Sequence, residues 1–178
     1  NASEWSVNFY GQYYKDEHII YHELTHLVDF TYDKELEKGA VCEDGSLYKS
    51  LGDVSDISKC ISLNSMTFII EGGAEIFSAK YFGNGIPSTY ESYTTTYNIL
   101  YRLFGEDIVN RIYLADKPAY ALYDLLVNKN GMSTKDFIKF YKTLDNVKGF
   151  DYKDRQSVRK VLENLVSLVK KDYKNDLY

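Results

Sequence analysis

Ten residues near the N-terminus decide how the rest of this chain is interpreted: Ile20-Tyr21-His22-Glu23-Leu24-Thr25-His26-Leu27-Val28-Asp29. Their apolar residues recur at helical spacing, so we expect a helix that is capped by Asp16 or a neighbour, runs to about Tyr32 and buries one face. On a helix with about 3.6 residues per turn, His22 and His26 lie one above the other, and two imidazoles so placed can bind one zinc ion. Glu23 is rotated by about 100° from His22, so its carboxylate can accept a proton from water without occupying a coordination position. The stretch therefore predicts metal-assisted hydrolysis.

A third histidine, His18, lies on the same face and offers an alternative pair with His22. That pair would put Ile19 where the proton acceptor must be. His18 and His26 are two turns apart, about 12 Å, which is too far to share one ion at bond lengths of about 2.0–2.1 Å. Ordinary surface histidines are the non-functional interpretation, but unpaired imidazoles on a buried helix face would be costly. We therefore expect His22 and His26 to be the ligands and His18 to be a partly exposed residue of the first turn.

A second predicted helix, residues 64–83, carries two acids on an otherwise apolar face. Asn64 is its expected cap and Gly83 its expected end. Glu71 and Glu75 are one turn apart, and buried carboxylates are costly unless a positive group pairs with them. A zinc ion with its histidines would supply that charge.

Two glycines interrupt this second helix at Gly72 and Gly73. Each glycine weakens a helix by about 1 kcal/mol relative to alanine, so the pair needs a reason. We expect another helix to pass too close for a side chain, and we assign that approach to the helix that carries the histidines.

Two motifs, His22-Glu23-x-x-His26 and Glu71-Gly72-Gly73-Ala74-Glu75, resemble those of the gluzincin metallopeptidases. In that group two helix histidines and a glutamate from a second helix hold zinc. The resemblance is closest to clostridial collagenase catalytic domains, and the anthrax lethal factor and Pro-Pro endopeptidase type is also similar. It covers about residues 5–83 and implies a zincin-like peptidase acting on a peptide or protein substrate.

The resemblance also implies a role for each matching residue. His22, His26 and Glu71 would bind zinc, and Glu23 would be the general base. Glu75, one turn after Glu71, would accept the N–H of a ligand imidazole and hold the ring in orientation. The reverse assignment of the two acids stays open, because sequence fixes helix rotation only loosely.

The supporting residues are less well defined. Asp29, one turn past His26, either braces the same imidazoles or faces solvent. The lethal factor type has a tyrosine seven residues before its ligand glutamate, where this chain has Asn64. A group that stabilises the oxyanion must then come from elsewhere. Tyr90, Tyr93 and Tyr97 are candidates by chain position, and packing in the core is the alternative for each.

The remaining stretches predict the rest of the fold. Trp5, Val7 and Phe9 alternate with polar residues, which indicates a short strand that either pairs with an extended substrate or simply packs in the core. Asp33 to Ser62 shows little periodicity, so we expect a long connection with at most one short element. Apolar stripes typical of core helices cover 88–104, 108–113, 118–127, 133–144 and 154–173.

We therefore expect one α+β domain, mostly α, over residues 1–178. It would consist of a metal-site half, about 3–83, with a short N-terminal strand and the zinc-binding helix pair, and an all-helical half, 84–178. Asn1-Ala2 resembles the remnant of a cleaved tag.

Composition limits the partners. The net charge is −5 with no basic run, which argues against nucleic acid, and the apolar runs are far shorter than the roughly 20 residues that span a bilayer. We expect a monomer. An extracellular or cell-surface location, with a leader removed, stays open.

Cys42 and Cys60 could form a disulfide that stabilises the fold by about 3 kcal/mol, or they could remain two free thiols. The sequence leaves both open.

Two other functions fit the same motifs. One is a catalytically inactive zincin-like domain that acts as a peptide-binding or regulatory module. The other is zinc-dependent hydrolysis of a non-peptide amide. The missing oxyanion tyrosine bears on the first of these, and the shape of the cleft would decide the second.

Overall fold

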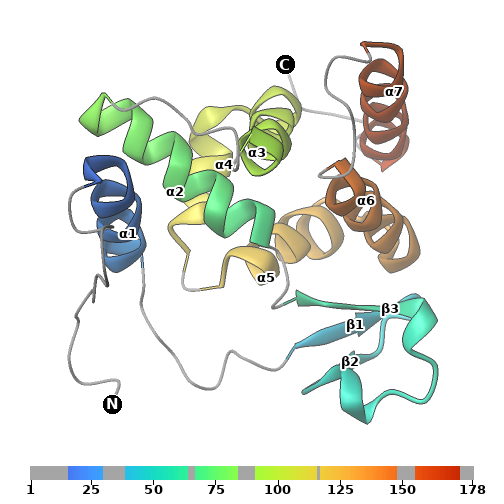
Figure 1. The fold of residues 1–178 in the computed structure, drawn as a ribbon. Coiled ribbons are helices and arrows are strands. Elements are labelled where there is room, and N and C mark those ends of the chain that lie inside the picture. The colour runs from blue at the N-terminus through green and yellow to red at the C-terminus, as the bar shows by residue number, and fades with distance from the viewer. Residues whose placement is uncertain are drawn as a thin grey trace.

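Helices make up most of the structure, and one small antiparallel sheet completes an α+β fold (Figure 1). The structure is a computed structural model, which describes residues 16–29, 39–63, 67–83, 91–115, 117–147 and 155–172. Its helices are α1 (Glu17–Asp29), α2 (Thr67–Phe82), α3 (Glu91–Phe104), α4 (Glu106–Tyr113), α5 (Pro118–Tyr123), α6 (Thr134–Asn146) and α7 (Arg155–Asp172). None of these described helices is both long and apolar enough to cross a membrane.

Helix α1 begins where the sequence predicts. The Asp16 carboxylate accepts hydrogen bonds from the backbone N–H groups of His18 and Ile19, at 3.0 and 3.5 Å, which otherwise lack a partner within the helix. The helix is described as far as Asp29. The expected continuation to Tyr32 and the expected strand at residues 5–9 lie outside the described residues.

The segment before α2 contains more structure than predicted. Three short strands, β1 (Ala40–Cys42), β2 (Leu47–Tyr48) and β3 (Cys60–Ser62), pair in the order β2-β1-β3, and both pairings are antiparallel. The expectation of at most one short element was therefore wrong. Strands of two or three residues are too short to show alternation, and all three residues of β1 are buried, which removes the polar positions that would mark a strand.

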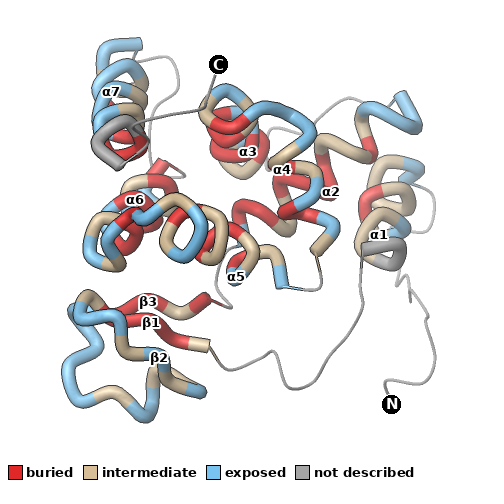
Figure 2. The backbone as a smooth tube through the Cα atoms, turned by 180° about the vertical axis from the view of Figure 1, so that it is seen from behind, coloured by how far each residue is buried: buried red, intermediate tan, exposed pale blue. Residues whose placement is uncertain are grey.

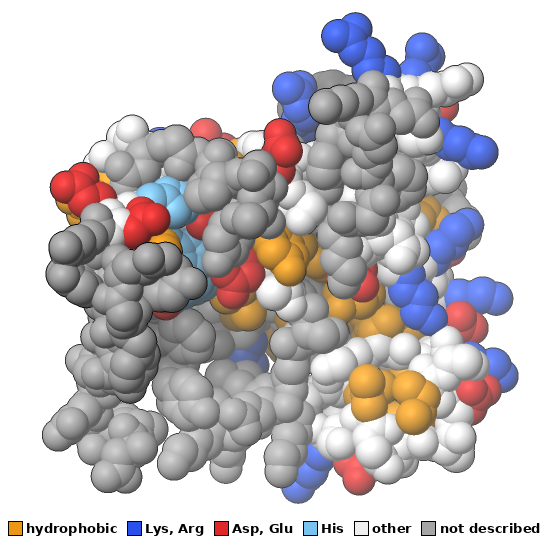
Figure 3. Space-filling model, in the orientation of Figure 1, with side chains coloured by type: hydrophobic (Ala, Val, Ile, Leu, Met, Phe, Trp, Pro, Cys, Tyr) orange, Lys and Arg blue, Asp and Glu red, His pale blue; other side chains and the backbone are white. Residues whose placement is uncertain are grey.

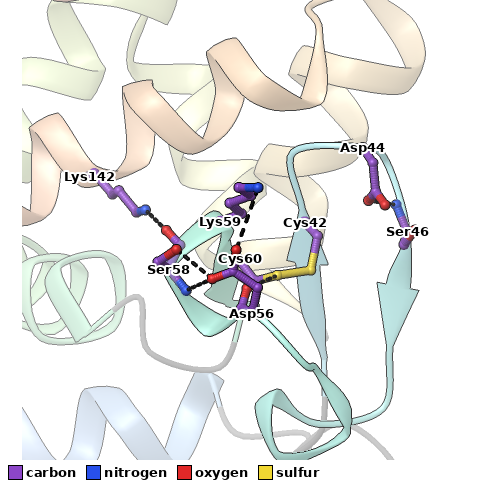
Figure 4. The surroundings of a disulfide bond; sticks show 8 residues. All are labelled: Cys42, Asp44, Ser46, Asp56, Ser58, Lys59, Cys60 and Lys142. Atoms are coloured by element: carbon purple, nitrogen blue, oxygen red, sulfur yellow. Dashed lines mark hydrogen bonds and ion pairs between the residues drawn. A yellow bond between two sulfur atoms is a disulfide. The ribbon is translucent and has the colours of Figure 1, made fainter.

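A disulfide joins Cys42, the last residue of β1, to Cys60, the first residue of β3 (Figure 4). Cys42 and Cys60 lie directly opposite each other in the strand register, so the bridge links paired residues. The structure thus selects the bridged alternative over two free thiols. Next to it, the Asp56 carboxylate accepts a hydrogen bond from the Ser58 backbone N–H at 3.2 Å, and the ammonium group of Lys142 on α6 donates to the Ser58 carbonyl at 2.9 Å.

The glycine pair of α2 contacts helices other than the predicted one. A Cβ on Gly72 would lie 2.6 Å from the Tyr93 carbonyl oxygen of α3, and a Cβ on Gly73 would overlap the ring of Tyr113 on α4. The prediction that the histidine helix makes this approach was wrong. The glycine pair showed that another helix must approach α2 closely. Several helices were available, and no residue near the glycines indicated which of them it is.

The predicted helices after residue 90 are confirmed, and they form most of the core (Figure 2). Gly105, with a φ of 84°, separates α3 from α4, and the Ser133 hydroxyl caps α6 by accepting from the Asp136 N–H at 3.1 Å. Helix α5 continues directly into a π-helical segment, Asp124–Lys129, which the sequence did not reveal. The largest fully buried side chains are Tyr97, Tyr113, Phe137, Phe140, Ile69, Leu100, Leu122, Leu126, Met132, Ile138 and Leu144.

Helix α2 lies between α1 and α3 (Figures 1 and 2). One side of α2, which carries the glycines, packs against α3 and α4 in the core. Another side faces α1 and carries the acids, so the two motifs meet between these two helices.

Candidate metal centre

Helices α1 and α2 contact each other through a row of alternating imidazoles and carboxylates. His18, His22 and His26 are one turn apart along α1, and Glu71 and Glu75 are one turn apart along α2. His18 contacts Glu75, whereas His26 contacts Glu71, so the chain order on the two helices is opposite. Histidine and acidic side chains gather on the face of the molecule seen in Figure 3. Two matching helical spacings thus build one continuous row of polar contacts.

Three atoms converge in this row. The Nε2 atom of His22 lies 3.0 Å from Nε2 of His26 and 3.1 Å from Oε2 of Glu71, and Nε2 of His26 lies 3.6 Å from the same oxygen. A tetrahedral zinc site with bonds of about 2.0–2.1 Å separates its ligand atoms by about 3.3 Å. His22, His26 and Glu71 therefore form a group that could hold one metal ion.

The tautomer of His22 supports the same conclusion. Its Nδ1 atom lies 2.6 Å from Oε1 of Glu75, in an ion pair, and a carboxylate oxygen only accepts, so this contact favours the form of His22 whose Nδ1 carries the hydrogen. In neutral His22, Nε2 then carries the lone pair, and that lone pair points at His26 and Glu71. Two imidazole nitrogens and one carboxylate oxygen form a donor set that suits zinc. The residues present fit this metal.

Burial and charge shape the metal-free site. The side chain of His22 is 4% exposed and that of Glu75 is 0% exposed. Burial lowers the pKa of His22, but hydrogen bonds and charge interactions with Glu71 and Glu75 outweigh burial and raise this pKa to about 9. Hydrogen bonds from His22 and His26 lower the pKa of Glu71 to about 2. A proton on His22 and a metal ion therefore compete for the same position.

Glu71 and Glu75 differ in what they contact. Oε2 of Glu71 belongs to the converging group, and its side chain is 27% exposed. Glu75 lies on the opposite side of the His22 ring, fully buried, between that ring and His18. This geometry separates the two acids into one that belongs to the candidate metal-binding group and one that contacts an imidazole from the other side.

Two of the other predicted residues lie on α1. Glu23 directly follows His22 and is half-buried. Asp29 is the last residue of α1, and its side chain is outside the described part of the structure.

The candidate tyrosines divide into three cases. Tyr97 is fully buried in the core, with its ring centroid 4.9 Å from that of Tyr101 and 6.1 Å from that of Tyr113. Tyr93 is half-buried on α3, and its backbone carbonyl faces Gly72. Tyr90 lies outside the described residues. For Tyr97 the structure therefore gives a core position, which is the alternative that the sequence left open.

One contact in the row was missed. His18 was expected to be a partly exposed first-turn residue, and its side chain is 17% exposed, but its Nε2 atom lies 3.2 and 3.1 Å from the two oxygens of Glu75. A signal was present in the sequence. His18 precedes His22 by the same four residues that separate Glu71 from Glu75, so two antiparallel helices in contact bring this pair together.

Comparison with known proteins identifies no relative: no family model matches the chain, and neither a curated protein nor a solved structure is significantly similar to it. The chain's own residues therefore have to indicate its function.

Proposed function

We propose that this chain is a zinc-dependent peptidase with a zincin-like active site, acting on a peptide or protein substrate. The observation that carries the proposal is the convergence of His22 Nε2, His26 Nε2 and Glu71 Oε2 from two helices, within 3.0 to 3.6 Å of one another. A glutamate directly after the first of these histidines accompanies the group. Metal-assisted hydrolysis needs both features.

Each residue of the site has its own role in this proposal. His22, His26 and Glu71 would hold the ion, and Glu75 would fix the His22 ring from the other side. Zinc, when bound there, acts as a Lewis acid that makes water a stronger nucleophile and polarises a carbonyl group. Glu23 accepts the proton of the attacking water and delivers it to the leaving amine. Its half-buried position beside His22 leaves it accessible for that exchange.

A comparison of wild type with Glu23→Gln tests the proposal. Both proteins are analysed for bound metal and then incubated with a peptide library whose products are identified by mass spectrometry. We expect equal zinc content, with cleavage by wild type and a loss of at least about 100-fold in Glu23→Gln, the range typical of a general base. Glu17→Gln is the matched control, because Glu17 is an exposed glutamate on the same helix, and it should cleave like wild type. Equal cleavage by both glutamine variants would remove Glu23 from the mechanism.

The burial of Tyr97 favours a second candidate function. With that hydroxyl in the core, one of the three candidate oxyanion donors is lost, as expected for a catalytically inactive domain that binds peptides or regulates a partner. The same experiment separates the two. Wild type that contains zinc, cleaves no peptide and retains library peptides on a column would support the binding module.

A further inference from the structure

We infer that His18 is a positioning residue of the metal centre, which holds Glu75 against the His22 ring and thereby strengthens metal binding. The inference rests on the proposed metal site, because its effect is exerted through the ligand His22. His18 itself does not belong to the group of three converging ligands.

The contacts of Glu75 carry the inference. Its Oε1 atom lies 2.6 Å from Nδ1 of His22, as an ion pair, and forms a hydrogen bond of 3.2 Å with Nε2 of His18. Its Oε2 atom lies 3.1 Å from the same Nε2 atom of His18. Among the described residues, the polar contacts of Glu75 are those with His18 and His22, and Oε2 has no hydrogen-bond partner beyond its 3.1 Å approach to the His18 imidazole. Apart from His22, the carboxylate therefore depends on His18.

Burial makes that dependence strong. The Glu75 side chain is 0% exposed, so the carboxylate cannot turn Oε2 towards bulk solvent. A buried carboxylate oxygen that loses its donor incurs a desolvation penalty that relaxes only if the group moves. The movement available to Glu75 is rotation about its own side-chain bonds, and that rotation also withdraws Oε1 from His22.

The position of His18 suits a fixed support. Its helix turn is held by Asp16, whose carboxylate accepts from the His18 backbone N–H at 3.0 Å. The His18 backbone and imidazole are therefore both fixed, one by the helix cap and the other by Glu75. A rigid donor of this kind restricts the His22 ring to the orientation that the metal requires.

Zinc affinity, measured by competition with a coloured chelator at fixed pH, tests the inference. The variants are His18→Leu, which removes the donor, and His18→Gln, whose amide N–H can reach about the same place as ring Nε2. Loss of a group that orients a ligand imidazole typically weakens metal binding by 10- to 100-fold. Since His18 acts through Glu75, we expect about a tenfold loss in His18→Leu and a loss of less than about threefold in His18→Gln. Glu17→Gln should bind as wild type does, because Glu17 is an exposed neighbour on the same turn.

The melting temperature of each metal-free protein is also measured. A variant that melts like wild type but binds zinc more weakly has lost the positioning of the ligand and has kept its fold. If His18→Leu fails to fold, His18→Asn replaces it, because that amide ends short of ring Nε2. Wild type that binds zinc, with equal affinity in His18→Leu, would overturn the inference and leave the proposed function intact. His18→Gln binding as weakly as His18→Leu would overturn it too, because the donor would then not be what matters. Wild type that binds no zinc would overturn the proposed function itself.

Discussion

Nδ1 of His22 lies 2.6 Å from Oε1 of Glu75, on the side of the ring that faces away from the three converging ligand atoms. In neutral His22, this one contact sets which ring nitrogen carries the hydrogen and where the other nitrogen points. It also explains why α2 carries a carboxylate with 0% exposure, which a helix core would otherwise exclude. The proposed metal position and its support are thus two parts of one contact between α1 and α2.

Replacing Glu75 by alanine should weaken zinc binding by about 10- to 100-fold, because the His22 ring loses the acceptor that orients it. Equilibrium competition with a chelator measures this. Glu91→Ala, an exposed glutamate on α3, is the control and should leave the affinity unchanged. Equal affinities in Glu75→Ala and wild type would show that the His22 ring is held by something else.

Local patterns predicted the helices of this fold well. Helix α1 is capped by Asp16 as its sequence indicates, and α3, α4, α6 and α7 each carry an apolar stripe that is buried in the structure. These features depend on residues within one or two turns of each other, so a sequence displays them directly. The ligand spacing of His22 and His26 belongs to the same class.

Features that depend on distant residues were not predictable in this way. The strand pairing of Cys42 with Cys60, the approach of Tyr113 to Gly73 and the contact of His18 with Glu75 all join different elements. Nothing near Gly73 says which helix fills the space. The matching four-residue spacings bring His18 to Glu75 only if α1 and α2 pack antiparallel, which their own residues do not specify. Such contacts depend on how the helices and strands pack against one another. The residue pattern within one element does not specify that packing.

Replacing Gly73 by alanine should destabilise the protein by about 1–3 kcal/mol, because the new methyl group overlaps the buried ring of Tyr113. This loss opposes the gain of about 1 kcal/mol that alanine brings to a helix. Urea unfolding measures the free energy of unfolding. In a Tyr113→Leu background the same replacement should become close to neutral.

Gly72→Ala provides the matched control for that cycle. Its methyl group would meet the Tyr93 backbone carbonyl, which no side-chain change removes, so Tyr113→Leu should not rescue it. Rescue of both variants to the same extent would mean that Tyr113 loosens the whole core and does not act on Gly73 in particular.

Removing the disulfide should lower the free energy of unfolding without altering the metal centre. The bridge closes a loop with a sequence separation of 18 residues, for which the loss of unfolded-state entropy corresponds to about 3 kcal/mol. The sheet lies on the other side of the molecule from α1 (Figure 1). We therefore expect a lower melting temperature and unchanged zinc affinity in Cys42→Ala/Cys60→Ala. Loss of zinc affinity in a folded double variant would show that the sheet supports the site.

The stability of the metal-free chain should depend on pH through His22 and Glu71. The pKa of His22 is raised from 6.5 to about 9, so its contribution to stability is fully present below pH 6.5 and is lost as the pH rises through about 9. This difference corresponds to about 3 kcal/mol. The pKa of Glu71 is lowered from 4.5 to about 2, so its contribution is present above pH 4.5 and is lost as the pH falls through about 2. The contributions of both groups are therefore complete only between about pH 4.5 and 6.5.

Urea unfolding with a chelator present, repeated from pH 5 to 9.5, measures this dependence. The free energy of unfolding should fall above pH 6.5. Glu71→Gln should reduce this fall, because Glu71 is a main cause of the raised pKa of His22. Constant stability from pH 6.5 to 9 in wild type would mean that the histidine is not charged in the metal-free state.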